Sequence, residues 1–235
     1  MYRYGYYGMD PTYILVLVGA LICLLASARV KSVYKRYSSQ RSMSGMTGAQ
    51  TAQRILQMNG ITDVTVQHIA GSLTDHYDPA KKIVSLSDAV YGSSSVAAVG
   101  VAAHECGHVL QHHEGYLPLQ IRTALVPAAN IGSQLGLPVV ILSLLLGLSQ
   151  TFTNIGVALF SLGVLFQIIT LPVEFNASSR ALKMLEGYGI LGAEETSGSR
   201  AVLNAAALTY VASAASMILQ LLRILALSNG RRRRR

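Results

Sequence analysis

The chain has 235 residues, of which 51% are hydrophobic and only 13% are charged, and its mean hydropathy is +0.40. So few charged side chains cannot cover a water-facing surface, which excludes an ordinary soluble domain. The formal net charge is +8, but five of the nineteen basic residues form the terminal run Arg231 to Arg235. Because the rest of the chain is only weakly basic, no nucleic-acid partner is expected. The two cysteines provide no disulfide framework.

Residues 1–28 form an N-terminal segment and the first predicted transmembrane helix. The eighteen residues between Asp10 and Arg29 carry no charge, and a helix of that length just spans a hydrocarbon core of about 30 Å. A signal peptide is not favoured, because it needs basic residues before the apolar run, whereas here they follow it. From Arg29 to Arg41 the chain is basic and contains no acidic residue. The positive-inside rule therefore places this end of the helix in the cytoplasm.

Residues 123–173 are predicted to form a transmembrane hairpin. These fifty-one residues contain no Asp, Glu, Lys or Arg, and two helices of about twenty-five residues fit into such a run. The turn is expected near residues 149–154. A hairpin returns the chain to the side that it left, so the residues on its two flanks share one face of the membrane.

Residues 174–235 comprise a segment that begins at Glu174 and a C-terminal apolar helix with an arginine tail. The apolar run from Ala201 to Leu222 is long enough to span a bilayer. If it crossed outward, however, the five terminal arginines would break the positive-inside rule. The favoured alternative is a helix that packs on the rest of the protein, with the tail at the anionic inner leaflet.

The polar part of the chain, residues 29–122, is predicted to be the catalytic part. Helical spacing of apolar residues predicts a helix over 48–58, and alternation predicts short strands over 64–70 and 81–87 around a turn at 74–80. The later of these two strands, 81–87, could pair with an extended substrate. Residues 96–113 read as a helix, with serines as N-caps before it and Gly115 as a stop after it.

The sequence His104-Glu105-Cys106-Gly107-His108 carries the chemistry. On a helix, positions i and i+4 lie on one face, so the two histidines can bind one zinc ion, while Glu105 can act as general base towards water. The alternative is a pair of core histidines with satisfied hydrogen bonds. Burying two histidines and a glutamate on an otherwise apolar helix is costly unless they have a functional partner, so the metal site is favoured.

A catalytic zinc ion needs a third protein ligand. A third histidine on the same helix is excluded, because Gln111 and Glu114 occupy the positions where that motif requires glycine and histidine. Glu174 is the first charged residue after the hairpin and is the predicted third ligand; the alternative is a glutamate that ends a span at the interface. Glu186 and His76 are the next candidates.

The sequence resembles a known family, the bacterial membrane-embedded neutral zinc metallopeptidases of the YugP type, which are distantly similar to CAAX-prenyl endopeptidase-like membrane proteases. The motifs that carry the resemblance extend over nearly the whole chain and include LTDHYDP, SSSVAAVGVAAHECGH, LVPAANIGS, TLPVEFNASSRAL and LNAAALTYVASAASMILQLL. The resemblance implies that His104, His108 and Glu174 are zinc ligands and that Glu105 is the catalytic base. The distant relatives have an aspartate where Ser178 stands, so Asn176 or Ser178 is expected to replace its supporting role.

These observations predict a mainly α integral membrane protein with transmembrane helices and a small cytoplasmic α+β, zincin-like catalytic part. The predicted activity is gluzincin-like: a zinc endopeptidase of the bacterial cell membrane that binds one Zn²⁺ per chain and acts on peptides or proteins at the cytoplasmic face. Arg180 and His76 are candidates for the oxyanion site or the cleft. Two alternatives stay open, a membrane assembly protein with a structural zinc and a zinc hydrolase of non-peptide amides or esters.

Overall fold

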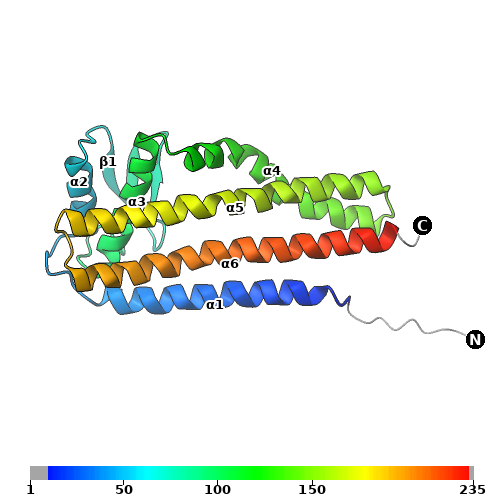
Figure 1. The fold of residues 1–235 in the computed structure, drawn as a ribbon, viewed down its shortest axis with the longest axis horizontal. Coiled ribbons are helices and arrows are strands. Elements are labelled where there is room, and N and C mark those ends of the chain that lie inside the picture. Colours follow the sequence, from blue (N-terminus) through cyan, green and yellow to red (C-terminus); the bar gives the residue numbers. More distant parts are fainter. Residues whose placement is uncertain (1–9, 233–235) are drawn as a thin grey trace, which may run out of the picture. The chain divides into compact units, whose positions relative to one another are not determined.

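The structure is a computed structural model that describes residues 10–232 of the chain (Figure 1). In this part of the chain the fold is mainly helical, with one small sheet, as the sequence predicts. The elements in chain order are α1 (Tyr13–Ser38), α2 (Gly48–Met58), β1 (Thr65–Ile69), β2 (His76–Asp78), β3 (Ile83–Ser87), α3 (Val96–His113), α4 (Leu117–Leu145), α5 (Gln150–Gly187) and α6 (Ala193–Arg232).

Four of these helices are long and apolar enough to cross a membrane: α1, α4, α5 and the part of α6 up to Ser228. The first three contain the apolar runs that the sequence assigns to membrane spans. The fourth contains the run for which the sequence favours packing on the protein instead. By length and composition α6 also qualifies as a span. The location of the arginine tail at the inner leaflet stays a prediction, and its last three residues lie outside the described part.

Two helices continue well beyond their apolar runs. α1 extends to Ser38, ten residues past the predicted end of the first span, because the chain contains no glycine or proline between Gly19 and Gly45. α5 extends to Gly187 rather than ending near residue 173. The apolar run and the segment that carries Glu174 therefore belong to one uninterrupted helix.

The chain divides into two compact units. Within the described residues, the first consists of 10–25, 125–168 and 211–232, and the second of 26–124 and 169–210. In the first unit Val140, Phe160 and Ile224 form a buried apolar cluster. Arg223 of α6 is accommodated there by the Asp10 carboxylate at 4.0 Å and by the Tyr13 ring, whose centroid lies 5.0 Å from the guanidinium carbon.

The second unit contains the sheet, whose strand order is β1-β3-β2. β1 pairs with β3 in parallel, with Thr65 opposite Ile83, and β2 pairs with β3 antiparallel, with His76 opposite Ser85. The segment 74–80, predicted as a turn, therefore contains a strand. β3 lies in the middle of the sheet and has neighbours on both sides, so the prediction that residues 81–87 pair with a substrate is wrong. The edge strand beside β3 is β2.

The serine N-cap and the glycine stop that the sequence predicts for α3 are confirmed. Ser95 caps α3, where its side chain accepts a hydrogen bond from the Ala98 amide at 3.2 Å. Thr47 and Gln50 form a capping box at the start of α2, a feature that sequence reasoning missed. Gly115 follows α3 with φ +65°, a conformation that favours glycine. The apolar sides of α2 and α3 share one buried core, in which Cys106 is completely buried.

Candidate metal centre

Three potential metal ligands from two helices meet in the second unit. α3 provides His104 and His108, one turn apart, and α5 provides Glu174. One oxygen of Glu174, Oε2, lies 3.3 Å from His104 Nε2 and 3.7 Å from His108 Nε2. The three ligand atoms all lie within 4.8 Å of one another. In the part of the chain that the structure describes, this is the one group of three or more His, Cys, Asp and Glu side chains arranged in this way.

The spacing of these atoms fits zinc. With metal–ligand bonds of about 2.0–2.1 Å and tetrahedral angles, two ligand atoms on one zinc ion are about 3.3–3.4 Å apart. The distances of 3.3 and 3.7 Å in the structure are close to that separation. The donor set of two imidazoles and one carboxylate also matches zinc chemistry, and the Glu174 side chain is only 5% exposed. An isolated carboxylate would be costly at such a site, so burial itself points to a cationic partner.

Hydrogen bonds to the other ring nitrogens orient both histidines. His104 Nδ1 is 3.1 Å from Ser178 Oγ on α5, and His108 Nδ1 is 3.0 Å from Gln111 Oε1 on α3. When each Nδ1–H donates to its partner, each Nε2 is left as a ligand atom that faces Glu174. Ser178 thus contacts a ligand histidine, which agrees with the expectation that Ser178 takes over the supporting role of the aspartate in the distant relatives.

Gln111 is itself held in place. Its side chain is completely buried, and its amide nitrogen donates to the Val173 carbonyl at 2.8 Å and to Asn176 Oδ1 at 3.0 Å. These bonds connect the support of His108 to the same stretch of α5 that carries Glu174. The orientation of one ligand and the position of another are therefore coupled.

A glycine allows α3 and α5 to approach closely at the centre. A Cβ atom added to Gly107 would lie 2.5 Å from the carbonyl oxygen of Ala177. Ala177 lies between Glu174 and Ser178, so this contact occurs where α5 supplies both groups to the α3 histidines. The variable position next to the second histidine is thus sterically restricted, although the motif itself leaves it unspecified.

Glu105 lies beside the three ligands and is not one of them. Its side chain is buried, and burial raises the pKa of its carboxyl above the ordinary value, although the nearby imidazoles of His104 and His108 oppose that rise. Burial also lowers the proton affinity of His108, but its hydrogen bond with Glu174 and the charge of Glu105 outweigh this, so the pKa of His108 is raised. A carboxyl at the wall of a cavity and beside the three ligand atoms can exchange a proton with a group bound there.

A cavity of about 250 Å³ opens next to these groups. The three ligand residues and Glu105 line one side of it. Other polar side chains in its wall are Asp75, His76, Tyr77, His112, Arg122, Thr123 and Tyr210. The cavity is therefore large enough to admit part of a substrate and contains both anionic and cationic groups near the ligands.

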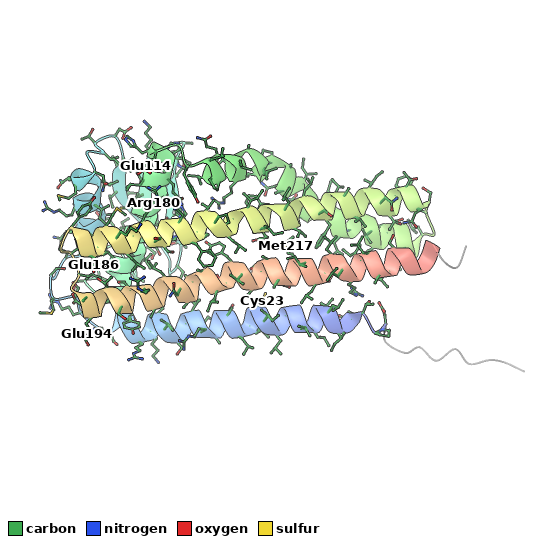
Figure 2. All side chains as sticks on the ribbon, viewed as in Figure 1. Cys23, Glu114, Arg180, Glu186, Glu194 and Met217 are labelled. Carbon is green, nitrogen blue, oxygen red and sulfur yellow. The ribbon has the colours of Figure 1, made fainter. Side chains whose placement is uncertain are left out.

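The sequence-based candidates differ in where they lie. His76 lines the cavity, as predicted for a cleft residue. Arg180 is not among the residues that line it: the Arg180 guanidinium forms an ion pair with Glu114 at 2.7 Å, donates to Asn176 Oδ1 at 2.7 Å and lies over the Tyr116 ring. Figure 2 shows Arg180 and Glu114 side by side. These contacts correct its assignment to the oxyanion site, because they occupy the guanidinium elsewhere.

Sequence reasoning missed Arg122, Tyr210 and Asp75 as cavity residues. Arg122 stands at the edge of the apolar hairpin, where it looks like an interfacial charge. Tyr210 lies in the apolar run 201–222. A polar hydroxyl group within an apolar run is the sequence feature that could have marked it as a cavity residue. Asp75 accepts hydrogen bonds from the Ser87 amide at 2.8 Å and hydroxyl at 3.0 Å, a contact that no local pattern indicates.

Comparisons with known proteins agree with this chemistry. The sequence model of the family described as "Putative neutral zinc metallopeptidase" matches residues 12–229. The chain is similar to the protein named "Putative membrane protease YugP" of Bacillus subtilis (strain 168), with 45% identity over 221 residues that cover 93% of this chain and 98% of that protein. No solved structure matches the chain. The family match includes both helices that supply the metal cluster.

Proposed function

Because the chain belongs to the family of neutral zinc metallopeptidases, we propose that it is a membrane-bound endopeptidase that hydrolyses peptide bonds with one zinc ion per chain. The ligands are His104, His108 and Glu174. The observation that carries this proposal is the convergence of their three ligand atoms beside the buried carboxyl of Glu105, at the wall of an open cavity.

In this proposal each residue near the metal ligands has a separate role in the hydrolysis. A zinc ion, when bound, supplies Lewis acidity that polarises a carbonyl group and lowers the pKa of a water molecule. Glu105 accepts the proton of the attacking water and returns it to the leaving nitrogen. Ser178 and Gln111 keep the two imidazoles oriented throughout, because each holds the Nδ1 atom of one histidine.

Tyr210 and Arg122 are the proposed donors to the developing oxyanion. Both line the cavity that contains Glu105. A donor held in place before the reaction lowers the energy of the transition state without reorganisation. This assignment replaces Arg180.

We propose that an extended substrate lies along β2. This short strand is at the edge of the sheet, and its residues His76 and Tyr77 line the cavity. Backbone groups at a free edge can pair with an added strand. In this proposal β2 takes the strand-pairing role that the sequence assigned to residues 81–87, and the paired substrate reaches Glu105.

We place the site at the cytoplasmic face of a bacterial cell membrane, in a multi-pass protein. The support is the basic segment after the α1 apolar run, Arg29 to Arg41, together with the positive-inside rule. The site residues belong to the same compact unit as this basic segment, residues 26–124 and 169–210.

The alternative of a structural zinc site is less well supported. A closed structural site has four protein ligands, whereas the cluster has three in the described part of the chain and borders a cavity. A non-peptide acyl substrate uses the same residues, so the substrate assay decides between it and a peptide.

The decisive experiment is the substitution Glu105→Gln. The variant should bind zinc like the wild type, because residue 105 is not a ligand, but should lose at least about 10²-fold in peptide cleavage, because an amide cannot accept the proton. The matched control is Glu186→Gln, an exposed glutamate on α5, which should keep both properties. A folded, zinc-loaded Glu105→Gln protein with near-normal cleavage of a mixed peptide library would contradict the proposal. Cleavage of esters or acyl amides alone would support the non-peptide alternative.

A further inference from the structure

A second cavity in the same compact unit has no role in the mechanism above. It has a volume of about 150 Å³ and shares Asp75, His104, Glu105, Glu174 and Tyr210 with the first cavity. Most of the rest of its wall is apolar, and comes from α3, α6 and the loop before β2. These apolar residues are Leu73, Val101, Val202, Leu203, Ala206 and Ala207.

We propose that this apolar cavity is a specificity site, which takes the bulky apolar side chain of a substrate residue next to the cleaved bond. The inference rests on the proposed function and adds the substrate class. Because the cavity includes ligand residues and the general base in its wall, a side chain inside it belongs to a residue whose backbone is at the reacting centre. Polar side chains are disfavoured in the part of the cavity away from these shared residues, since apart from Ser178 the wall there is apolar and leaves their hydrogen-bonding groups unpaired.

The size of the cavity selects the side chains that fit. An engineered protein cavity of about 150 Å³ admits a benzene ring, so leucine, methionine or phenylalanine fits here. Glycine and alanine leave most of the space empty. In apolar pockets each methylene group of the substrate changes specificity by about 10- to 200-fold. A clear preference for bulky apolar residues is therefore expected.

Two alanines on one side of α6 make the space. Val202, Ala206 and Tyr210 follow each other at intervals of four residues and thus lie on one face of the helix. Ala207 adds a second methyl group to the same wall and is itself only 4% exposed. A larger side chain at position 206 would occupy the volume that the substrate side chain needs.

Leu73 provides an independent reason to expect a ligand. Its side chain is 56% exposed although it is apolar, and its backbone has φ +58°, a left-handed conformation that is uncommon for residues with a Cβ atom. A strained residue of this kind persists where the surroundings fix it, and such residues are concentrated at binding sites. An apolar ligand in the cavity would give the exposed leucine a contact that it lacks.

The loop that carries Leu73 is attached to the sheet at both ends. The Gly71 amide donates to Asp88 Oδ2 at 2.8 Å, and the Asp88 amide donates to the Gly71 carbonyl at 3.1 Å. On the other side, Asp75 accepts two hydrogen bonds from Ser87. These contacts hold Leu73 in the wall of the cavity, so it can contact the substrate side chain without a large rearrangement.

The test measures binding rather than turnover. The full-length chain, purified in detergent and loaded with zinc, is titrated with the hydroxamates of glycine, leucine and phenylalanine, which share one metal-binding group and differ in the side chain. The wild type should bind the leucine or phenylalanine compound at least about 10-fold more tightly than the glycine compound. Ala206→Phe should remove this preference and leave the affinity for the glycine compound within about threefold.

Two further variants make the result interpretable. Leu208→Phe enlarges an exposed residue of α6 that does not line the cavity, and it should keep the wild-type preference. Leu73→Gly removes the apolar side chain and suits the positive φ, so it should fold normally and weaken binding of the leucine compound selectively. If Ala206→Phe does not fold, Leu73→Gly decides the matter.

Equal affinity of the wild type for the three compounds would overturn the inference, as would a full preference in folded Ala206→Phe or Leu73→Gly. These failures differ from failure of the proposed function. A protein that shows the side-chain preference but cleaves no peptide refutes only the endopeptidase activity. A protein that cleaves peptides irrespective of the residues beside the scissile bond refutes only the specificity site.

Discussion

Gly107→Ala tests whether close packing of α3 against α5 builds the metal centre. The new Cβ atom would lie 2.5 Å from the Ala177 carbonyl oxygen, 3.0 Å from its carbonyl carbon and 3.1 Å from its Cα atom. All three are backbone atoms and cannot rotate away. Ordinary contact begins at 3.4 Å, so the two helices must separate by about 0.9 Å at this point or the backbone must deform.

This displacement is large on the scale of metal coordination. Metal–ligand distances are held within about 0.2 Å, and Glu174 and Ser178 lie on either side of Ala177. The variant should lose at least about 10-fold in zinc affinity, in the range of changes to groups that support ligands. Overpacking of this kind also costs about 1–3 kcal/mol of stability.

The assay is zinc competition with a chelator of known affinity, combined with thermal unfolding followed by circular dichroism. The matched control is Gly187→Ala at the end of α5, because a Cβ atom there meets nothing within 4 Å. The control should keep zinc affinity and lose no stability, since alanine is the better helix former. If folded Gly107→Ala keeps both the zinc affinity and the melting temperature of the wild type, the argument from close packing is wrong.

Three further predictions concern the ligands, the oxyanion donor and the topology. Glu174→Ala should weaken zinc binding by at least about 10- to 100-fold while Glu186→Ala does not; full zinc occupancy at wild-type affinity in the first variant would show that the third ligand lies elsewhere. Tyr210→Phe should keep zinc but lose about 10²- to 10³-fold in kcat, as expected for an oxyanion donor, and an unchanged kcat would exclude that role. In a Cys23→Ser background, a cysteine at Met43, which is 93% exposed, should react with an impermeant maleimide only after permeabilisation, whereas one at Ser149 in the α4–α5 turn should react in intact cells. The reverse pattern would place the metal centre outside the cell.

The sequence by itself determined the features that depend on local spacing. The two histidines one helical turn apart, the glutamate between them and the serine N-cap all follow from the geometry of a single helix, so α3 and its chemistry could be predicted from the neighbouring residues 95–113. The apolar runs are equally local, because the length of an uncharged segment alone decides whether it can cross a bilayer. Glu174 could be proposed, since a hairpin returns the chain to its starting side, but its contact with the histidines could not be shown.

Only the tertiary structure decided which distant groups meet. Ser178 lies against His104, Gln111 links His108 to α5, and Gly107 permits the approach of the two helices; each contact joins segments that no periodicity relates. The order of the strands moved the proposed substrate contact from β3 to β2, because β3 has a neighbour on both sides and β2 lies at the edge. Arg180 was a reasonable candidate by its position after Glu174, yet its ion pair with Glu114 depends on where the end of α3 lies. Spacing along one helix is set by its hydrogen bonds, whereas pairing between elements is set by the packing of the whole unit.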